Sequence, residues 1–276
     1  MRLKATIGKA IRMRADMFGY QVKGGTAGWM PLCVNPLLKF AGVELAPKNS
    51  AGSTYIGCSS TLTSAQRAGL TVPAYVAQIW EEQGVVEQFV QYLRNLLPLA
   101  NCSKILEIGA GTGRFLEPIY LLANPSSYEV YDTNSDWADY LVRTYKVTAH
   151  KADGRSLGQT PDASQNLVHA HGVFVYLSIP VAFGYFHEMC RVCAPGGFVV
   201  FDCFLSDRQT LSSIERWRTN RDEWPIILPR EPIIALFNQS GFETVAADYE
   251  TKTFRSGYSQ YLIFRRRDVR PADCGF

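Results

Sequence analysis

The sequence of 276 residues predicts an α/β fold, with one mostly parallel sheet of seven strands behind a helical and irregular extension. Short apolar and β-branched runs alternate with helix-like stretches over residues 103 to 267. The first of these runs ends in glycines at alternate positions, and the last two are close enough in sequence to form a hairpin. A content of 47% hydrophobic and 19% charged residues suits a globular chain with one substantial core and an appendage.

The first strand leads into a glycine-rich loop, in the run Ile105-Leu-Glu-Ile-Gly-Ala-Gly-Thr-Gly-Arg-Phe115. Its alternating glycines are Gly109, Gly111 and Gly113. Glycines turn sharply and leave no side chain between the backbone and a ligand, so the run predicts a nucleotide-type binding loop that includes Ala110. Glu107, just before the turn, is placed to anchor a cationic group or to orient the loop.

The second predicted strand, Ser127 to Asp132, is rich in aromatic and β-branched residues and ends in a carboxylate. That carboxylate follows the loop by about twenty residues, the spacing at which nucleotide-binding folds hold ribose hydroxyls. We therefore expect Asp132 to bind a ribose, and the adjacent Thr133 to belong to the same cofactor-binding site. Nicotinamide-binding folds share this spacing, so it does not identify the cofactor.

Further strands continue the alternation. The third, Val147 to Lys151, leads to Asp153 and Gly154, and the fourth is the start of the stretch Asn166 to Leu177. The turn Ala194-Pro-Gly-Gly197 precedes a fifth strand, Phe198 to Phe204. The remaining two strands start at Ser240 to Val245 and at Ser259 to Arg265.

The spacing Glu-x-Gly-x-Gly-x-Gly at residues 107 to 113 resembles motif I of the class I S-adenosylmethionine (SAM)-dependent methyltransferases. The exit of the fourth strand is similar to motif IV of that family, with His171 as the polar residue before Gly-Val. The Pro-Gly-Gly turn is also a family feature that nicotinamide-binding folds lack. The resemblance implies a Rossmann-like seven-stranded sheet with an antiparallel edge strand, and SAM as the cofactor.

The resemblance also assigns site residues. It implies that the glycine loop and Asp132 hold the cofactor, that Asp153 and Gly154 lie at the adenine amino group, and that His171 lies against the cofactor. A dinucleotide fingerprint would need a small residue where this chain has Arg114. An NAD(P)-dependent oxidoreductase is therefore the weaker alternative, and a catalytically silent SAM-binding subunit is another.

The residues at the fourth strand exit bear on the acceptor. A sugar hydroxyl needs its proton removed, whereas an amine or a carboxylate needs far less help. His171 is the first candidate base, because imidazole titrates in the useful range, although a role in packing against the cofactor remains open. His169 is expected to be buried and hydrogen-bonded. Tyr176 is a candidate for orienting the acceptor, or is structural.

The acceptor itself is indicated by weaker patterns. The stretch Tyr75 to Gly84 resembles the lead-in segment of methyltransferases that act on sugars and polysaccharides. Together with the candidate base, it predicts O-methylation of a small-molecule or glycan-like acceptor. No two histidines or carboxylates have the spacing of a metal site, so no metal is expected.

The chain is expected to divide into an extension with lid helices (1–98), a methyltransferase domain (99–268) and a tail (269–276). Residues 26 to 70 look irregular, and two helices with a hinge at Gly84 follow up to Leu97. Trp80 is interpreted as a core anchor rather than a cofactor wall. An insert at 206–229 mixes aromatic and basic residues that suit a polar or anionic substrate: Arg208, Arg216, Trp217, Arg218, Arg221 and Trp224.

Charge and cysteine content bear on the partners and the cellular location of the protein. A net charge of +3 does not require a nucleic-acid partner, and seven cysteines at irregular spacing indicate a reducing, cytoplasmic location. Cys190 and Cys193 are interpreted as core residues rather than a zinc or redox pair. No apolar run is long enough to span a membrane. The basic segment 1–25 either packs on its own domain or a sister subunit in a homodimer, or associates weakly with an anionic surface.

Overall fold

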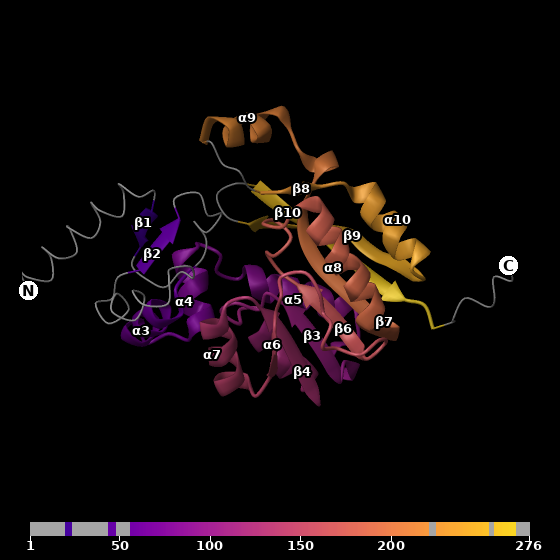
Figure 1. Ribbon diagram of the computed structural model, residues 1–276, viewed down its shortest axis with the longest axis horizontal. Coiled ribbons are helices and arrows are strands. Elements are labelled where there is room, and N and C mark those ends of the chain that lie inside the picture. Colours follow the sequence, from indigo (N-terminus) through magenta and orange to yellow (C-terminus); the bar gives the residue numbers. More distant parts are fainter. Residues whose placement is uncertain (1–19, 24–43, 48–55, 221–224, 254–256, 269–276) are drawn as a thin grey trace, which may run out of the picture. The chain divides into compact units, whose positions relative to one another are not determined.

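The structure is a computed structural model that describes residues 20–23, 44–47, 56–220, 225–253 and 257–268 (Figure 1). The chain divides into two compact units, Met1–Val76 and Ala77–Phe276. This boundary lies before the position at 98 expected from the sequence, and a lid role for the helices near it remains a prediction. The basic segment 1–25 lies outside the described residues, apart from residues 20–23, which form a strand.

The first unit contains a small antiparallel pair, β1 (Tyr20–Lys23) with β2 (Glu44–Pro47), followed by helix α3 (Cys58–Ala68). The helix ends at Gly69, whose φ of 68° is a left-handed conformation that glycine adopts without strain. Helix α4 (Val72–Ile79) begins in this unit.

Helix α3 corrects the prediction that residues 26 to 70 lack regular structure. Its buried positions are Cys58, Thr61 and Ala65, which share one helical face. Because these side chains are small or polar, they produce no apolar periodicity in the sequence, which is why the helix was missed.

The second unit contains the sheet, whose seven main strands have the order β5-β4-β3-β6-β7-β10-β9. Strands β3 to β7 are parallel, and β10 pairs antiparallel with both β7 and β9. The bounds are β3 (Lys104–Ile108), β4 (Ser127–Asp132), β5 (Thr148–Lys151), β6 (Gln165–Ala170), β7 (Cys193–Leu205), β9 (Phe242–Thr253) and β10 (Gly257–Arg266). The predicted mostly parallel sheet with an antiparallel edge strand is confirmed.

Two details differ from the prediction. The Ala194-Pro-Gly-Gly197 segment was expected as a turn before the fifth strand, but it forms the irregular start of β7, where the register against β6 shifts and Gly196 has a φ of 74°. In addition, the insert contributes a short strand, β8 (Ile227–Leu228), which pairs parallel with the end of β7.

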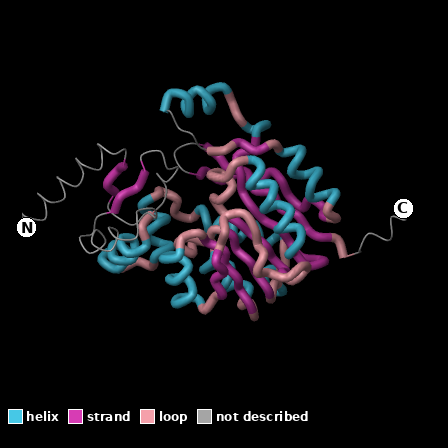
Figure 2. Tube along the Cα trace, in the orientation of Figure 1, coloured by secondary structure: helices cyan, strands magenta, loops and turns pink. Residues whose placement is uncertain are grey.

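Helices cover both faces of this sheet (Figure 2). One face packs against α5 (Val85–Leu96), α6 (Leu116–Ala123) and α7 (Ser135–Tyr145), and the other against α8 (Ile179–Val192) and α10 (Arg230–Gln239). Helix α9 (Leu211–Asn220) belongs to the insert and carries the exposed apolar residues Leu211 and Ile214.

Aromatic packing holds the second face. The rings of Phe237 on α10 and Phe264 on β10 are stacked with centroids 4.0 Å apart, and Phe186 on α8 stacks on Phe201 of β7 at 4.7 Å. All four side chains are fully buried, and each contributes roughly 2–3 kcal/mol by leaving water. The parallel pairing of β3 to β7 brings their carboxyl ends to one edge of the sheet.

Candidate functional site

The backbone of the glycine-rich loop after β3 packs closely against Val173, which follows β6, and against Leu141 on α7. Gly109, Gly111 and Gly113 have φ values of 66°, 51° and 81°. A Cβ atom at Gly109 would lie 2.6 Å from Val173 Cγ2, and one at Gly113 would lie 2.9 Å from Leu141 Cδ2. At these two positions both the conformation and the close approach require glycine. The result is a cradle of bare backbone at the carboxyl end of β3.

Asp132 ends the neighbouring strand β4 and is bonded to this loop. Its Oδ2 accepts a hydrogen bond from the Gly111 amide at 2.8 Å, and its Oδ1 accepts one from the Asn134 amide at 2.8 Å. Burial raises the pKa of this carboxyl, while the two amide hydrogen bonds act in the opposite direction. The half-buried carboxylate is therefore tied to the glycine loop, with lone pairs left for a ligand hydroxyl.

The loops after β4 and β5 lie next to each other. A Cβ atom at Gly154 would be 3.8 Å from Thr133 Cγ2, so two of the predicted cofactor-binding positions adjoin. Asp153 is exposed, and it accepts hydrogen bonds from the Arg155 and Ser156 amides and from the Ser156 hydroxyl, each at 2.7 Å. These bonds, led by that of the Ser156 hydroxyl, lower the pKa of Asp153. The Asp153 turn is thus internally braced.

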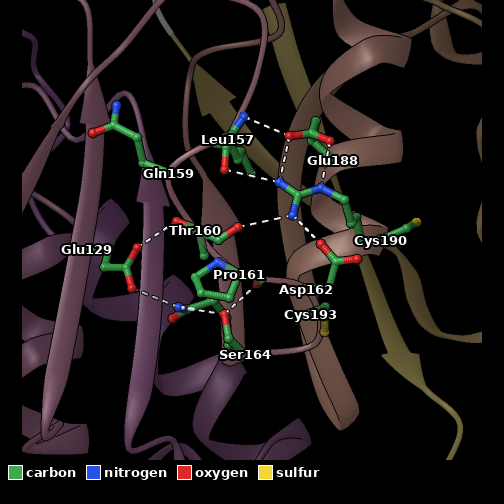
Figure 3. Close-up of polar contacts among 12 residues, drawn as sticks. Glu129, Leu157, Gln159, Thr160, Pro161, Asp162, Ser164, Glu188, Cys190 and Cys193 are labelled. Carbon is green, nitrogen blue, oxygen red and sulfur yellow. Dashed lines mark hydrogen bonds and ion pairs between the residues drawn. The ribbon is translucent and has the colours of Figure 1, made fainter.

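An arginine that the sequence interpretation did not assign holds the chain after this turn. Arg191 on α8 pairs with Glu188 through Nε and Nη2, both at 2.8 Å, and with Asp162 at 2.5 Å. It also donates to the carbonyl groups of Leu157 and Thr160, each at 3.0 Å. Figure 3 shows Glu188, Asp162, Thr160 and Leu157 around this guanidinium. We call this set the Arg191 clamp; it fixes residues 157 to 162 against α8.

Glu107 lies inside the protein, which favours the expectation that it orients the loop over the expectation that it anchors a cationic group. Its side chain is buried on the α5 face of the sheet, and Oε2 is 2.7 Å from the Tyr128 hydroxyl. Burial raises the pKa of Glu107 to about 8. The group is therefore largely protonated at neutral pH, and it supports the sheet below the loop.

A chain of buried hydrogen bonds continues from Glu107 toward the exit of β6. The Tyr128 hydroxyl is 2.8 Å from His169 Nε2, His169 Nδ1 is 3.0 Å from His171 Nε2, and His171 Nδ1 is 3.1 Å from the Tyr261 hydroxyl. We call Glu107, Tyr128, His169, His171 and Tyr261 the buried relay. His169 is buried and hydrogen-bonded, as predicted. Tyr128 and Tyr261 could not be assigned from the sequence, because each meets the histidines only through the fold.

His171 is enclosed on all sides. Both ring nitrogens bond within the relay, and its ring stacks on that of Phe115 with centroids 3.8 Å apart. Burial lowers its pKa well below the ordinary value, and His169 and Arg114 lower it further. A base needs a free nitrogen and a suitable pKa, and this histidine has neither. The geometry favours the second sequence interpretation, in which His171 packs at the site.

Tyr176 follows the β6 exit and is half-buried. Its amide donates to the Val173 carbonyl at 3.1 Å, and its side chain packs beside Val175 and Phe204. Its role in orienting an acceptor remains a prediction.

Two of the basic residues of the insert form ion pairs within the described structure. Arg208 pairs with Glu250 at 3.5 Å and Arg218 with Glu215 at 2.7 Å. The other basic and aromatic residues of the insert lie outside the described part, either whole (Arg221 and Trp224) or in their side chains (Arg216 and Trp217).

Cys190 and Cys193 are buried free thiols, and burial raises the pKa of Cys190 to about 12. Such thiols are unreactive core residues.

The described residues contain neither a metal-binding cluster nor a membrane-crossing helix. No group of three or more His, Cys, Asp or Glu side chains in that part of the chain could hold a metal ion. Among the same residues, no helix has the length and apolar character that crossing a membrane requires.

Trp80 and Arg114 lie together beside the glycine loop. The Arg114 guanidinium carbon is 4.8 Å from the centre of the Trp80 ring, and Nη2 is 2.7 Å from Glu82 Oε2. Trp80 is half-buried, and its interpretation as a core anchor rather than a cofactor wall remains a prediction. The amphipathic pattern of the sequence does not reveal that the Trp80 ring packs against the Arg114 guanidinium.

Comparison with known proteins places the chain in a family. Residues 80–247 match a family model described as a methyltransferase domain. No curated protein matches the chain.

Solved structures show the same fold. The magnesium protoporphyrin IX methyltransferase of Synechocystis PCC 6803 with bound SAH is 15% identical, with a TM-score of 0.51 over 67% of this chain and 82% of that one. An O-methyltransferase family protein of Burkholderia thailandensis is 14% identical, with a TM-score of 0.53 over 72% and 60%. A SAM-dependent methyltransferase of Archaeoglobus fulgidus is 13% identical, with a TM-score of 0.54 over 69% and 97%. At these identities the likeness shows the fold alone.

Proposed function

This chain belongs to the methyltransferase domain family and is a SAM-dependent methyltransferase, and from that premise we propose that it methylates an oxygen atom of a small-molecule or glycan-like acceptor. The stretch Tyr75 to Gly84, which resembles the lead-in segment of methyltransferases that act on sugars and polysaccharides, supports oxygen as the acceptor atom. The family assignment also sets aside a nicotinamide cofactor.

The residues at the β3 and β4 exits fit the cofactor. A Cβ atom would fill the cradle at Gly109 and Gly113, and the bond from the Gly111 amide to Asp132 Oδ2 holds a carboxylate beside the cradle. This bond is the observation that carries the cofactor assignment. We propose that Asp132 accepts the ribose hydroxyls, with Thr133, Asp153 and Gly154 toward the adenine. SAM supplies a methyl group on a sulfonium, whose leaving group is a neutral thioether.

The protein's own task is then alignment of the acceptor oxygen. His171 lacks a free ring nitrogen, so it is poorly suited to remove the proton of a sugar hydroxyl. An acceptor oxygen that is already ionised, such as a carboxylate or an acidic hydroxyl, needs no base. This favours acidic small molecules, including acidic glycans, over neutral sugars within the proposed class.

A panel assay tests the proposal. Purified protein with radiolabelled SAM is offered matched carboxylate, phenol, neutral sugar and amine acceptors. We expect transfer to oxygen, strongest for the ionised acceptors, and a wild-type rate that does not depend on a histidine pKa between pH 6 and 8. Transfer to amines alone would overturn the choice of oxygen. Saturable binding of S-adenosylhomocysteine (SAH) without turnover on any acceptor would favour the silent SAM-binding alternative.

Replacing His171 separates its two roles. His171→Gln keeps a hydrogen-bonding side chain but removes any imidazole base. If His171 only packs, turnover on the phenol acceptor, whose hydroxyl must lose a proton, stays within a few-fold of wild type while thermal stability falls. A loss of more than about 100-fold in kcat, with SAH affinity intact, would reinstate the histidine as the base, since general-base catalysis contributes roughly 10²–10⁴-fold.

A further inference from the structure

Asp202 is a buried carboxylate near the end of β7, only 2% exposed. Its Oδ1 accepts a hydrogen bond from the Gly172 amide at 2.6 Å, and the Ser259 hydroxyl on β10 also bonds to the carboxylate. Burial raises the pKa of Asp202 to about 6, while the bonds from the Gly172 amide and the Ser259 hydroxyl lower it. The group is therefore mostly ionised at neutral pH.

A carboxylate at this depth is costly, and an apolar side chain would fill the position with less loss of hydration. Side chains alternate along a strand, and Phe198 and Val200, which share the face of Asp202, are apolar members of the core. Ala170 at the end of β6 pairs with Phe201, so Asp202 stands level with the start of the loop after β6. Its place suits holding that loop better than filling the core.

The loop after β6 lies between Asp202 and the glycine loop. Gly172 has a left-handed φ of 66°, and its amide is the group that Asp202 binds. The next residue, Val173, packs against the glycine loop, because a Cβ atom at Gly109 would lie 2.6 Å from Val173 Cγ2. The hydrogen bond to Gly172 therefore sets where the Val173 side chain meets the glycine loop.

We propose that Asp202 is a positioning residue for cofactor binding: it holds the Gly172 amide and so keeps Val173 seated against Gly109, which gives the glycine loop its binding conformation in the absence of ligand. The inference rests on the use of SAM at this loop, stated under the proposed function. A loop that is already ordered binds more tightly, because less conformational freedom is lost on binding.

Calorimetric titration of the full chain with SAH provides the test. Asp202→Ala removes the acceptor of the Gly172 amide and should weaken SAH binding by roughly 10-fold or more, as expected for loss of a hydrogen bond to a charged group. Asp202→Asn keeps a side-chain oxygen for that amide, so its affinity should return to within about fivefold of wild type. Equal losses in the two variants would show that the bond to Gly172 is not the cause and would overturn the inference.

A double-mutant cycle tests the path through Val173. Val173→Ala shortens the side chain that meets Gly109 and should weaken SAH binding by roughly threefold or more. The double variant Asp202→Ala/Val173→Ala should bind about as well as Asp202→Ala alone, because both residues act through one contact. Losses that multiply would contradict this path. Unchanged affinity in Val173→Ala would also overturn the inference, even if Asp202→Ala does not fold.

A loss of stability elsewhere in the sheet is the control. Phe242 is a buried ring at the start of β9, where it packs edge-on against Phe237. Phe242→Leu should melt at a lower temperature but bind SAH as the wild type does. A loss of affinity like that of Asp202→Ala would show that binding merely follows stability, and Asp202 would have no positioning role.

Failure of the proposed function would give a different result. Wild-type protein that does not bind SAH would contradict the cofactor site itself. Wild-type protein that binds SAH, with the same affinity in Asp202→Ala, would overturn the role of Asp202 alone.

Discussion

Glu107 shows how a single buried residue sets the pH response of the molecule. Burial raises its pKa from 4.5 to about 8, so between these values the folded state holds more protons than the unfolded state. Its contribution to stability therefore falls as pH rises through this window. His169 acts in the opposite sense at lower pH, because burial lowers its pKa from 6.5 to about 3 and folding gains stability as the pH rises over that range.

Above pH 6.5 the effect of Glu107 on stability can be distinguished from the opposing effect of His169. From pH 6.5 to 8 the free energy of unfolding should decrease in the wild type, by roughly 1–2 kcal/mol from Glu107. Glu107→Gln, which imitates the protonated form, should flatten that slope in urea denaturation. Glu87→Gln, at an exposed position on α5, is the matched control and should keep the wild-type slope. Equal slopes in all three proteins would show that Glu107 does not titrate in this window.

Gly109 provides a second test at the scale of single residues. Gly109→Ala would place a methyl group 2.6 Å from Val173 Cγ2 at a φ of 66°. We expect a loss of roughly 1–3 kcal/mol in stability from backbone strain, together with weaker SAH binding. Gly158→Ala, whose new Cβ would meet only Ser156 Oγ at 3.6 Å, should be nearly neutral in both assays. Similar behaviour of the two variants would contradict the requirement for glycine in the cradle.

Among the elements, helix α8 positions the chain after β5. The Arg191 clamp bonds two backbone carbonyl groups and two carboxylates across that connection. The Leu157 amide also donates to Glu188 Oε2 at 2.8 Å, so both backbone groups of Leu157 are held by α8. The Asp153 turn ends where this support begins.

Removing the clamp should loosen the connection. Arg191→Met is expected to destabilise the protein by about 2–4 kcal/mol, since it leaves partly buried carbonyl and carboxylate groups unpaired. Hydrogen exchange at the Leu157 and Thr160 amides should also accelerate. Arg191→Lys should recover only part of the lost stability, because lysine lacks the planar guanidinium that donates several hydrogen bonds at once. The control is Arg218→Met, an exposed pair with Glu215, expected within about 0.5 kcal/mol. An unchanged exchange rate at Leu157 would contradict the clamp.

The elements also show what the sequence could reveal. The strands β3, β4 and β6 were predictable because apolar and β-branched runs end at glycine or aspartate, and α5 was predictable from its apolar periodicity. Helix α3 and strand β8 carry no such pattern. The Arg191 clamp and the buried relay depend on side chains brought together by strand register; His171 and Tyr261 are 90 residues apart in sequence.

In the sheet-containing unit, strand order gives the site its form. Parallel strands β4, β3 and β6 place Asp132, the glycine loop and His171 at adjacent exits. Open parallel sheets bind ligands at such exits, which is why the order and spacing of these residues predict a site at this edge. The chemical state of its residues could not, because burial decides whether Glu107 is charged and whether a histidine has a free nitrogen.

We propose that this edge of the sheet binds SAM, with Asp132 on the ribose. Calorimetric titration of the purified protein with SAH, with NADH and NADPH as controls and Asp132→Ala as the comparison, tests it most directly. We expect saturable binding of SAH alone, weakened at least about tenfold in Asp132→Ala by loss of a charge-assisted hydrogen bond. Binding of a nicotinamide nucleotide instead, or SAH affinity unchanged by the substitution, would contradict it.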